Sequence, residues 1–180
     1  MTPMTPIRRT DPPLAVDEAT TLTAFLDYHR DTLRLKTADL TQQQLGASLS
    51  PSTLTLAGLV KHMALVESSW FSEVFLGEPM MAPFDTADWE SDRDWEFTSA
   101  PGDAPDELRA LFDRAVSRSD AIIRVALDLN GLDGLSAKES RQEKTPFSLR
   151  WILVHMIEEY ARHNGHADLI RESIDGVTGE

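Results

Sequence analysis

A short C-terminal stretch, HMIEEYARHNGHADLIRE at residues 155–172, gathers side chains that could bind a metal ion. His155, Glu159, His163 and His166 follow one another at spacings of four, four and three residues. Imidazole nitrogens and carboxylate oxygens are common ligands of divalent transition metals. Since an α-helix has about 3.6 residues per turn, these spacings place all four side chains on one face of a helix.

The same face of this helix carries apolar residues, so the row is expected to point toward the protein interior. At ~100° per residue, Ile152 falls in the same sector as Glu159 and His163. Glu158 falls on the solvent side, which separates the two adjacent glutamates. A carboxylate in a dry interior is costly unless a cation compensates its charge. Either a metal ion held with imidazoles or an ion pair with Arg162 could compensate Glu159.

No single ion can contact the whole row. From His155 to His166 the helix rises roughly 16 Å, whereas metal–ligand bonds are only ~2.0–2.2 Å long. Only neighbours one turn apart can share an ion: 155/159, 159/163 or 163/166. A third ligand must come from another helix, and His62 or His29 could supply it. The row alone leaves open the alternative that these are polar core residues paired with one another without a metal.

The composition of the 180-residue chain narrows the possible functions. It contains no cysteine, so a metal must be held by His, Asp or Glu, and a reactive thiol must come from another molecule. The net charge of -13, without a basic block, makes nucleic acid an unsuitable partner. No apolar run reaches the ~18 residues of a membrane span, so we expect a cytoplasmic protein without a membrane contact.

Hydrophobic periodicity predicts four helices that would position the row. They cover residues 17–39, 53–76, 105–129 and 145–174. Four helices of this length, without strand-like alternation, predict an all-α four-helix bundle. Residues 1–16 are expected to form a flexible N-terminal segment, and residues 17–180 a single metal-binding domain.

Local signals predict where some of these helices begin and end. The second helix is expected to stop at Gly77 and the fourth at Gly176, while Thr145-Pro146 is expected to open the fourth. Residues 78–102 show no periodicity and predict a long irregular acidic loop between the second and third helices, either a solvated loop or a lid or pocket wall. Trp151 is expected to pack in the core.

Two segments resemble a known family. GLVKHMALVESSWF, which contains His62, and FSLRWILVHMIEEYARHNGHADLIRES are similar to the actinobacterial branch of the DinB/YfiT-like superfamily. That superfamily has a four-helix bundle that binds a divalent metal, commonly through three histidines. Here Glu159 and His163 occupy the positions of its usual last-helix His-x-x-x-His pair. The mycothiol-dependent maleylpyruvate isomerase shares this His, Glu, His set, so the resemblance implies His62, Glu159 and His163 as ligands, with His155 and His166 as neighbours.

The resemblance also implies an activity. Related proteins use one divalent metal ion and a low-molecular-weight thiol such as mycothiol. We therefore expect a transferase that moves such a thiol onto an electrophilic small molecule, with detoxification as the expected role. Zinc or nickel is the expected ion, with iron or manganese as options. The alternative is a metal-binding helical bundle without catalysis, which serves structure or interaction. A homodimer is possible.

Overall fold

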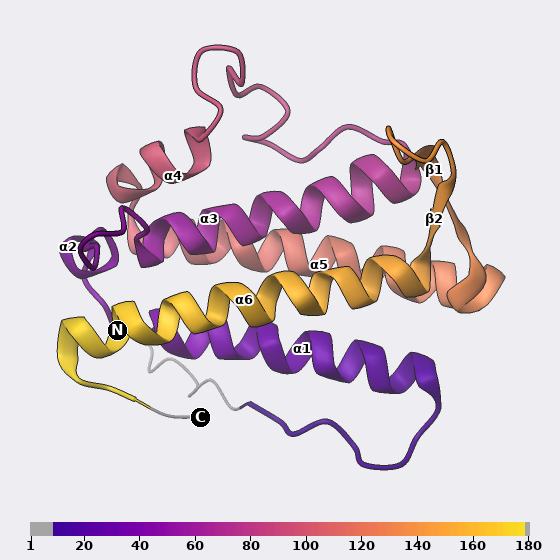
Figure 1. Ribbon diagram of the computed structural model, residues 1–180, viewed down its shortest axis with the longest axis horizontal. Helices are drawn as coiled ribbons and strands as arrows, with labels where there is room; N and C mark the ends of the chain where they lie inside the picture. The colour runs from indigo at the N-terminus through magenta and orange to yellow at the C-terminus, as the bar shows by residue number, and fades with distance from the viewer. Residues whose placement is uncertain (1–8, 179–180) are drawn as a thin grey trace.

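The computed structural model of the protein describes residues 9–178, and this part is predominantly helical, as predicted. Four long helices dominate it: α1 (Glu18–Thr37), α3 (Leu56–Glu67), α5 (Pro105–Asn130) and α6 (Leu149–Asp175). Figure 1 shows them lying alongside one another along the long axis of the molecule. Of the N-terminal segment that was expected to be flexible, residues 1–8 lie outside the described part, and residues 9–16 contain no helix or strand.

Side-chain caps explain where three of the long helices begin. Asp17, Thr55 and Ser148 precede α1, α3 and α6, and each side chain accepts a hydrogen bond from the backbone N–H three residues further on. These bonds satisfy N–H groups that have no partner within the helix. The helices therefore start where a short polar side chain can turn back onto the first turn.

Glycines end two helical segments at the predicted positions. α3 continues without a break as a π-helical segment, η1 (Ser68–Leu76), which stops at Gly77. α6 stops at Gly176. Both glycines have a positive φ, 73° and 75°, a conformation that residues with a Cβ adopt at a cost. Both predicted stops are confirmed.

The prediction that the fourth helix opens at Thr145-Pro146 is wrong. Pro146 instead begins β2 (Pro146–Ser148), which pairs antiparallel with β1 (Leu135–Glu139). The hairpin follows the short 3-10 helix η3 (Gly131–Asp133) and lies at one end of the helices in Figure 1. Two strands of five and three residues are too short to show an alternating pattern. Ser148 rather than Thr145 caps α6.

The segment at 78–102 is only partly irregular. Residues 78–94 form turns joined by irregular backbone, and the chain then folds into α4 (Trp95–Ser99) and the 3-10 helix η2 (Ala100–Gly102). Phe84 is fully buried and anchors the turns to the core. In Figure 1, α4 lies beside α3, near the small helix α2 (Gln42–Leu45). α4 and η2 therefore cover part of α3, whereas much of the turn region before them extends into solvent.

A buried polar cluster crosses the core between three of the long helices. Arg30 of α1 and Glu67 of α3 form a two-point ion pair, with N–O distances of 2.7 and 2.8 Å. The Tyr160 hydroxyl of α6 donates a further hydrogen bond of 2.7 Å to Glu67. All three side chains are at most 1% exposed. The Arg30–Glu67–Tyr160 cluster therefore ties α1, α3 and α6 together at one level.

No helix within the described residues combines the length and the apolar character that a bilayer span requires.

Candidate metal centre

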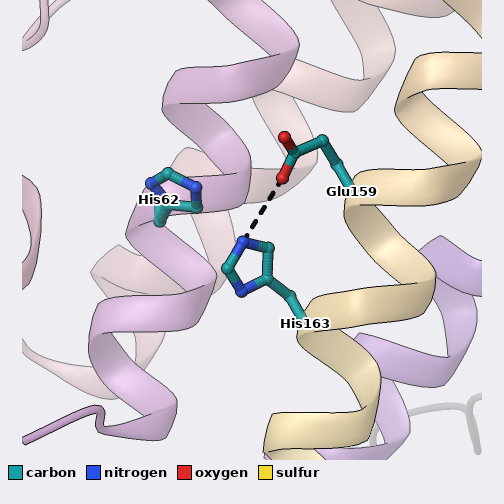
Figure 2. A group of neighbouring side chains, drawn as sticks. All are labelled: His62, Glu159 and His163. Carbon is teal, nitrogen blue, oxygen red and sulfur yellow. Dashed lines mark ion pairs between the residues drawn. The ribbon is translucent and has the colours of Figure 1, made fainter.

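Three residues singled out in the sequence meet in the space between α3 and α6. His62 comes from the middle of α3, while Glu159 and His163 project from successive turns of α6 toward it (Figure 2). One potential ligand atom from each residue lies within 4.8 Å of the others. His163 Nε2 is 3.4 Å from Glu159 Oε2, and the His62 and His163 ring centroids are 4.9 Å apart.

Two levels of structure produce this cluster. Glu159 and His163 meet because residues four apart lie one above the other on a helix. His62 reaches them only because α3 packs beside α6 at this height. The chemistry of the set fits a divalent transition metal, since it offers two imidazoles and one carboxylate at distances that a small adjustment could bring to a common ion.

The expectation that Glu159 lies in a dry interior is wrong. Its side chain is 27% exposed, against 21% for His62 and 13% for His163. The wheel position correctly places Glu159 on the inner side and Glu158, which is 57% exposed, on the outer side. However, a wheel angle gives the direction of a side chain and not how deeply the neighbouring helix covers it. The cluster is therefore partly open to solvent.

No basic side chain neutralises Glu159 within residues 9–178. Its charged-group contacts are imidazoles only, His163 at 3.4 Å and His155 Nε2 at 3.7 Å. Arg162, the possible ion-pair partner, binds Glu158 at 2.7 Å instead. The carboxylate thus faces nitrogen ligands rather than a guanidinium, which favours the metal-binding interpretation of the row over the salt-bridge interpretation.

The pKa of His163 supports a ligand role. Burial, followed by the nearby His62, lowers this pKa to about 4, although Glu159 opposes both effects. The imidazole is therefore neutral near pH 7. A neutral imidazole has the free lone pair that a metal ligand needs.

The remaining histidines lie around the cluster without joining it. His166 Nδ1 is 3.5 Å from His163 Nδ1, and His155 lies beside Glu159. His29, the alternative third ligand, instead lies against Asn164, whose side-chain amide donates to the His29 carbonyl at 2.9 Å. The structure thus brings His62, and not His29, to the α6 pair.

Aromatic side chains enclose His155 on the outer side of the cluster. The ring centroids of Trp70 and His155 are 4.6 Å apart in an edge-to-face arrangement. The Trp151 ring stacks on the His155 imidazole, with the two centroids 5.1 Å apart. The expectation that Trp151 packs in the core is wrong, because it is 46% exposed. These rings form an apolar wall next to the cluster.

Sequence reasoning missed two residues that hold His62. The Glu96 carboxylate of α4 lies 3.0 Å from His62 Nδ1, and the Phe97 ring stacks on the imidazole at 4.8 Å with an interplanar angle of 24°. Both belong to the segment in which the sequence shows no periodicity. The only advance signal was the length of that segment, which is unusual for a loop without function.

An open groove of about 370 Å³ is connected with the cluster through Glu96, which lines the groove and contacts His62. It runs along the end of α3 and the start of η1, and residues of the turns before α4 form part of its wall. One lining residue, Trp70, is the aromatic neighbour of His155. Its walls are formed by Leu65, Val66, Ser69, Trp70, Glu73, Met80, Trp89, Arg93 and Glu96.

Fold and cluster together describe a helical protein with a candidate His–Glu–His metal centre, and comparison with known proteins places it in a family. The model of the mycothiol-S-transferase family matches residues 21–176, most of the chain and all three clustered residues. The chain therefore belongs to the mycothiol-S-transferase family, which is DinB/YfiT-like. The resemblance seen in the sequence is confirmed. No curated protein matches the chain in sequence.

A solved structure supports the fold. The crystal structure of a conserved protein from Enterococcus faecalis superimposes with a TM-score of 0.60 over 91% of this chain and 100% of that chain. The two sequences share 18% identity. At that identity the likeness establishes a common fold and carries no information on substrate.

Proposed function

We propose that this protein transfers a low-molecular-weight thiol, mycothiol or a close analogue, onto an electrophilic small molecule, with the help of one divalent metal ion. The observation that carries the proposal is the His62–Glu159–His163 cluster in a member of the mycothiol-S-transferase family. In this proposal, residues 17–180 form one domain, a four-helix bundle of the DinB/YfiT-like type.

The three side chains would hold the ion. Glu159 contributes a negative charge, and His62 and His163 contribute neutral nitrogens. Three protein ligands leave further coordination positions open, which is typical of catalytic rather than structural sites. A set of two imidazoles and one carboxylate suits zinc or nickel, and also iron or manganese. When bound, a divalent cation supplies Lewis-acid chemistry: it lowers the pKa of a thiol and so favours the nucleophilic thiolate.

The rest of the site would receive the two substrates. Because the chain has no cysteine, the reacting sulfur belongs to a cosubstrate. In the reaction, the thiol loses its proton and its sulfur forms a bond to an electrophilic carbon. In a substitution, the bond from that carbon to a leaving group breaks and the electron pair departs with the group; in an addition, a C=C or ring C–O bond breaks, the electron pair stays on the substrate, and the substrate takes up a proton. The groove connected with the cluster through Glu96 supplies apolar and aromatic walls, including Trp70, Trp89 and Met80, against which an electrophile could lie.

Metal content and thiol consumption test the proposal. Natively purified protein should contain about one divalent metal ion per chain by elemental analysis. His163→Ala should remove this ion, whereas Glu158→Gln on the exposed side of the same helix should retain it. The metal-loaded parent protein should also consume mycothiol in the presence of members of an electrophile panel, with the conjugate identified by mass spectrometry.

Two outcomes would limit the proposal. Absence of a metal ion from the natively purified parent protein would contradict the proposed metal centre. A metal-loaded protein that consumes mycothiol no faster than buffer with every electrophile would reject the transferase activity and leave a non-catalytic metal-binding domain. Chelation then distinguishes the two kinds of ion. Removal of a structural ion should cause a large loss of thermal stability, whereas removal of a catalytic ion should leave the fold intact.

A further inference from the structure

The imidazole of His62 is held from two directions by one short helix. Glu96 and Phe97 are neighbours on α4, yet one binds the His62 ring edge and the other covers its face. Glu96 is only 5% exposed, although α4 belongs to an otherwise solvent-facing acidic segment. An inward-facing carboxylate in such a segment needs a physical reason, because burying it costs free energy.

The hydrogen bond to Glu96 determines which nitrogen of His62 is free. A carboxylate can only accept hydrogen bonds, so the proton of the neutral imidazole must lie on Nδ1, which contacts Glu96 Oε1 at 3.0 Å. The lone pair is then on Nε2, the other ring nitrogen. Metal-binding histidines commonly donate their second N–H to a carboxylate in this way.

We propose that Glu96 is a positioning residue of the metal centre, which fixes the Nδ1–H tautomer and the ring orientation of His62 so that Nε2 is available to the ion. This inference rests on the metal centre of the proposed function. A cation at Nε2 would draw electron density from the ring and strengthen the Nδ1–H bond to the carboxylate, so the two interactions support each other.

Packing around Phe97 restricts the ring further. Gly58 lies one turn before His62 on α3, and a Cβ at this position would approach Phe97 Cδ1 to 2.8 Å. Real Cβ atoms do not tolerate such a distance, so the missing side chain is what allows Phe97 to lie against the helix and stack on His62. A glycine inside a helix lowers its stability. Here it permits the close contact of α4 with α3.

The second carboxylate oxygen of Glu96 argues against a purely structural role. Within residues 9–178, Glu96 Oε2 is buried and has no hydrogen-bond partner. A glutamate selected only to stabilise the fold would be expected to satisfy both oxygens, as Glu67 does through Arg30 and Tyr160.

The tautomer of His62 can be measured without metal. Two-bond proton–nitrogen correlation spectra of the metal-free protein, with His62 assigned from its loss in His62→Gln, should show the proton on Nδ1. In Glu96→Leu the proton should move toward Nε2, the site that imidazole favours in water. A parent protein that already carries the proton on Nε2 would overturn the inference.

Zinc affinity provides the second readout. Competition with a coloured chelator should show that Glu96→Leu weakens Zn²⁺ binding by about 10- to 100-fold, the range usual for such partners of a ligand histidine. Glu96→Gln, which keeps an acceptor oxygen, should recover part of the loss. Glu90→Gln, an exposed charge removed from the same segment, should bind like the parent. If Glu96→Leu does not fold, Glu96→Gln replaces it as the test variant. Its loss of Zn²⁺ affinity should then be larger than that of Glu90→Gln.

The two proposals can fail separately. Unchanged Zn²⁺ affinity in the folded Glu96 variants, with loss in His62→Ala, would reject positioning by Glu96 and keep the metal centre. A parent protein that binds none of Zn²⁺, Ni²⁺, Fe²⁺ and Mn²⁺ would contradict the metal centre, whereas the tautomer spectra would still decide whether Glu96 orients His62.

Discussion

Two carboxylates on the helix pair α3 and α6 have opposite surroundings. Glu67 of α3 is fully buried and is matched by the Arg30 guanidinium and the Tyr160 hydroxyl. Glu159, the residue before Tyr160 on α6, is partly exposed and faces imidazoles at 3.4 and 3.7 Å. Tyr160 thus takes part in a complete protein ion-pair cluster, whereas Glu159, one residue earlier on α6, faces imidazoles with which it could hold a metal ion.

The difference indicates separate tasks. In the Arg30–Glu67–Tyr160 cluster the chain supplies its own cation, and every partner is within hydrogen-bond distance. Burial and the negative charge of Glu67 both raise the pKa of Tyr160, so its hydroxyl keeps its proton and donates. Burial opposes the charge of Arg30, but Glu67, Tyr160 and Asp120 together outweigh this effect and raise the guanidinium pKa. We interpret this cluster as structural and the His62–Glu159–His163 cluster as functional.

Arg30→Met should have the largest effect, because it leaves Glu67 buried without a cation. We expect the free energy of unfolding to fall by about 3–5 kcal/mol, the range for removal of one partner of a buried ion pair. Urea denaturation of the metal-free protein measures it. Arg162→Met, which removes an exposed partner of Glu158, is the control. A loss below about 1 kcal/mol in Arg30→Met would mean that the two carboxylates do not differ as described.

Glu159→Gln should remove metal binding while preserving the fold. Loss of a ligand should exceed the loss of a supporting residue, so Zn²⁺ affinity should fall at least about 100-fold, or about 3 kcal/mol. The metal-free variant should unfold within about 0.5 kcal/mol of the parent, as partly exposed sites usually do. The same change at Glu67 should instead destabilise the metal-free protein. Equal destabilisation by both substitutions would remove the distinction between the two sites.

Tyr160→Phe tests one bond of the structural cluster. The ring remains, but Glu67 loses the donor at 2.7 Å. We expect a loss of about 1–3 kcal/mol in the free energy of unfolding, since a buried acceptor loses a partner. The Zn²⁺ affinity should not change, although the residue is adjacent to Glu159. A fall in affinity comparable to that of Glu159→Gln would show that the clusters are coupled.

Glu158→Gln should have the smallest effect. Its partner Arg162 is 64% exposed, and such i, i+4 pairs on a helix surface contribute about 0.3–0.5 kcal/mol. Thermal unfolding and metal content should both stay close to those of the parent. A clear loss of metal would contradict the assignment of Glu159, rather than Glu158, to the cluster.

Much of the fold was predictable because its signals are local. Apolar periodicity indicated the long helices, and Gly77 and Gly176 indicated two of their ends. The error at Thr145-Pro146 arose because a threonine before a proline can precede a helix or, as here, enter a strand. Pairing of β2 with β1 decided between the two, and that pairing depends on residues about ten positions upstream.

The same distinction between local and long-range contacts decides which parts of the candidate site could be predicted. The sequence by itself determined that Glu159 and His163 lie within reach of each other, and that Glu158 points away, because helix geometry follows from spacing alone. Only the tertiary structure decided that His62 rather than His29 completes the set, that Arg162 leaves Glu159 to the imidazoles, and that Glu96 lies behind His62. These outcomes depend on how separate helices pack, and contacts between residues distant in sequence leave no periodic trace in it.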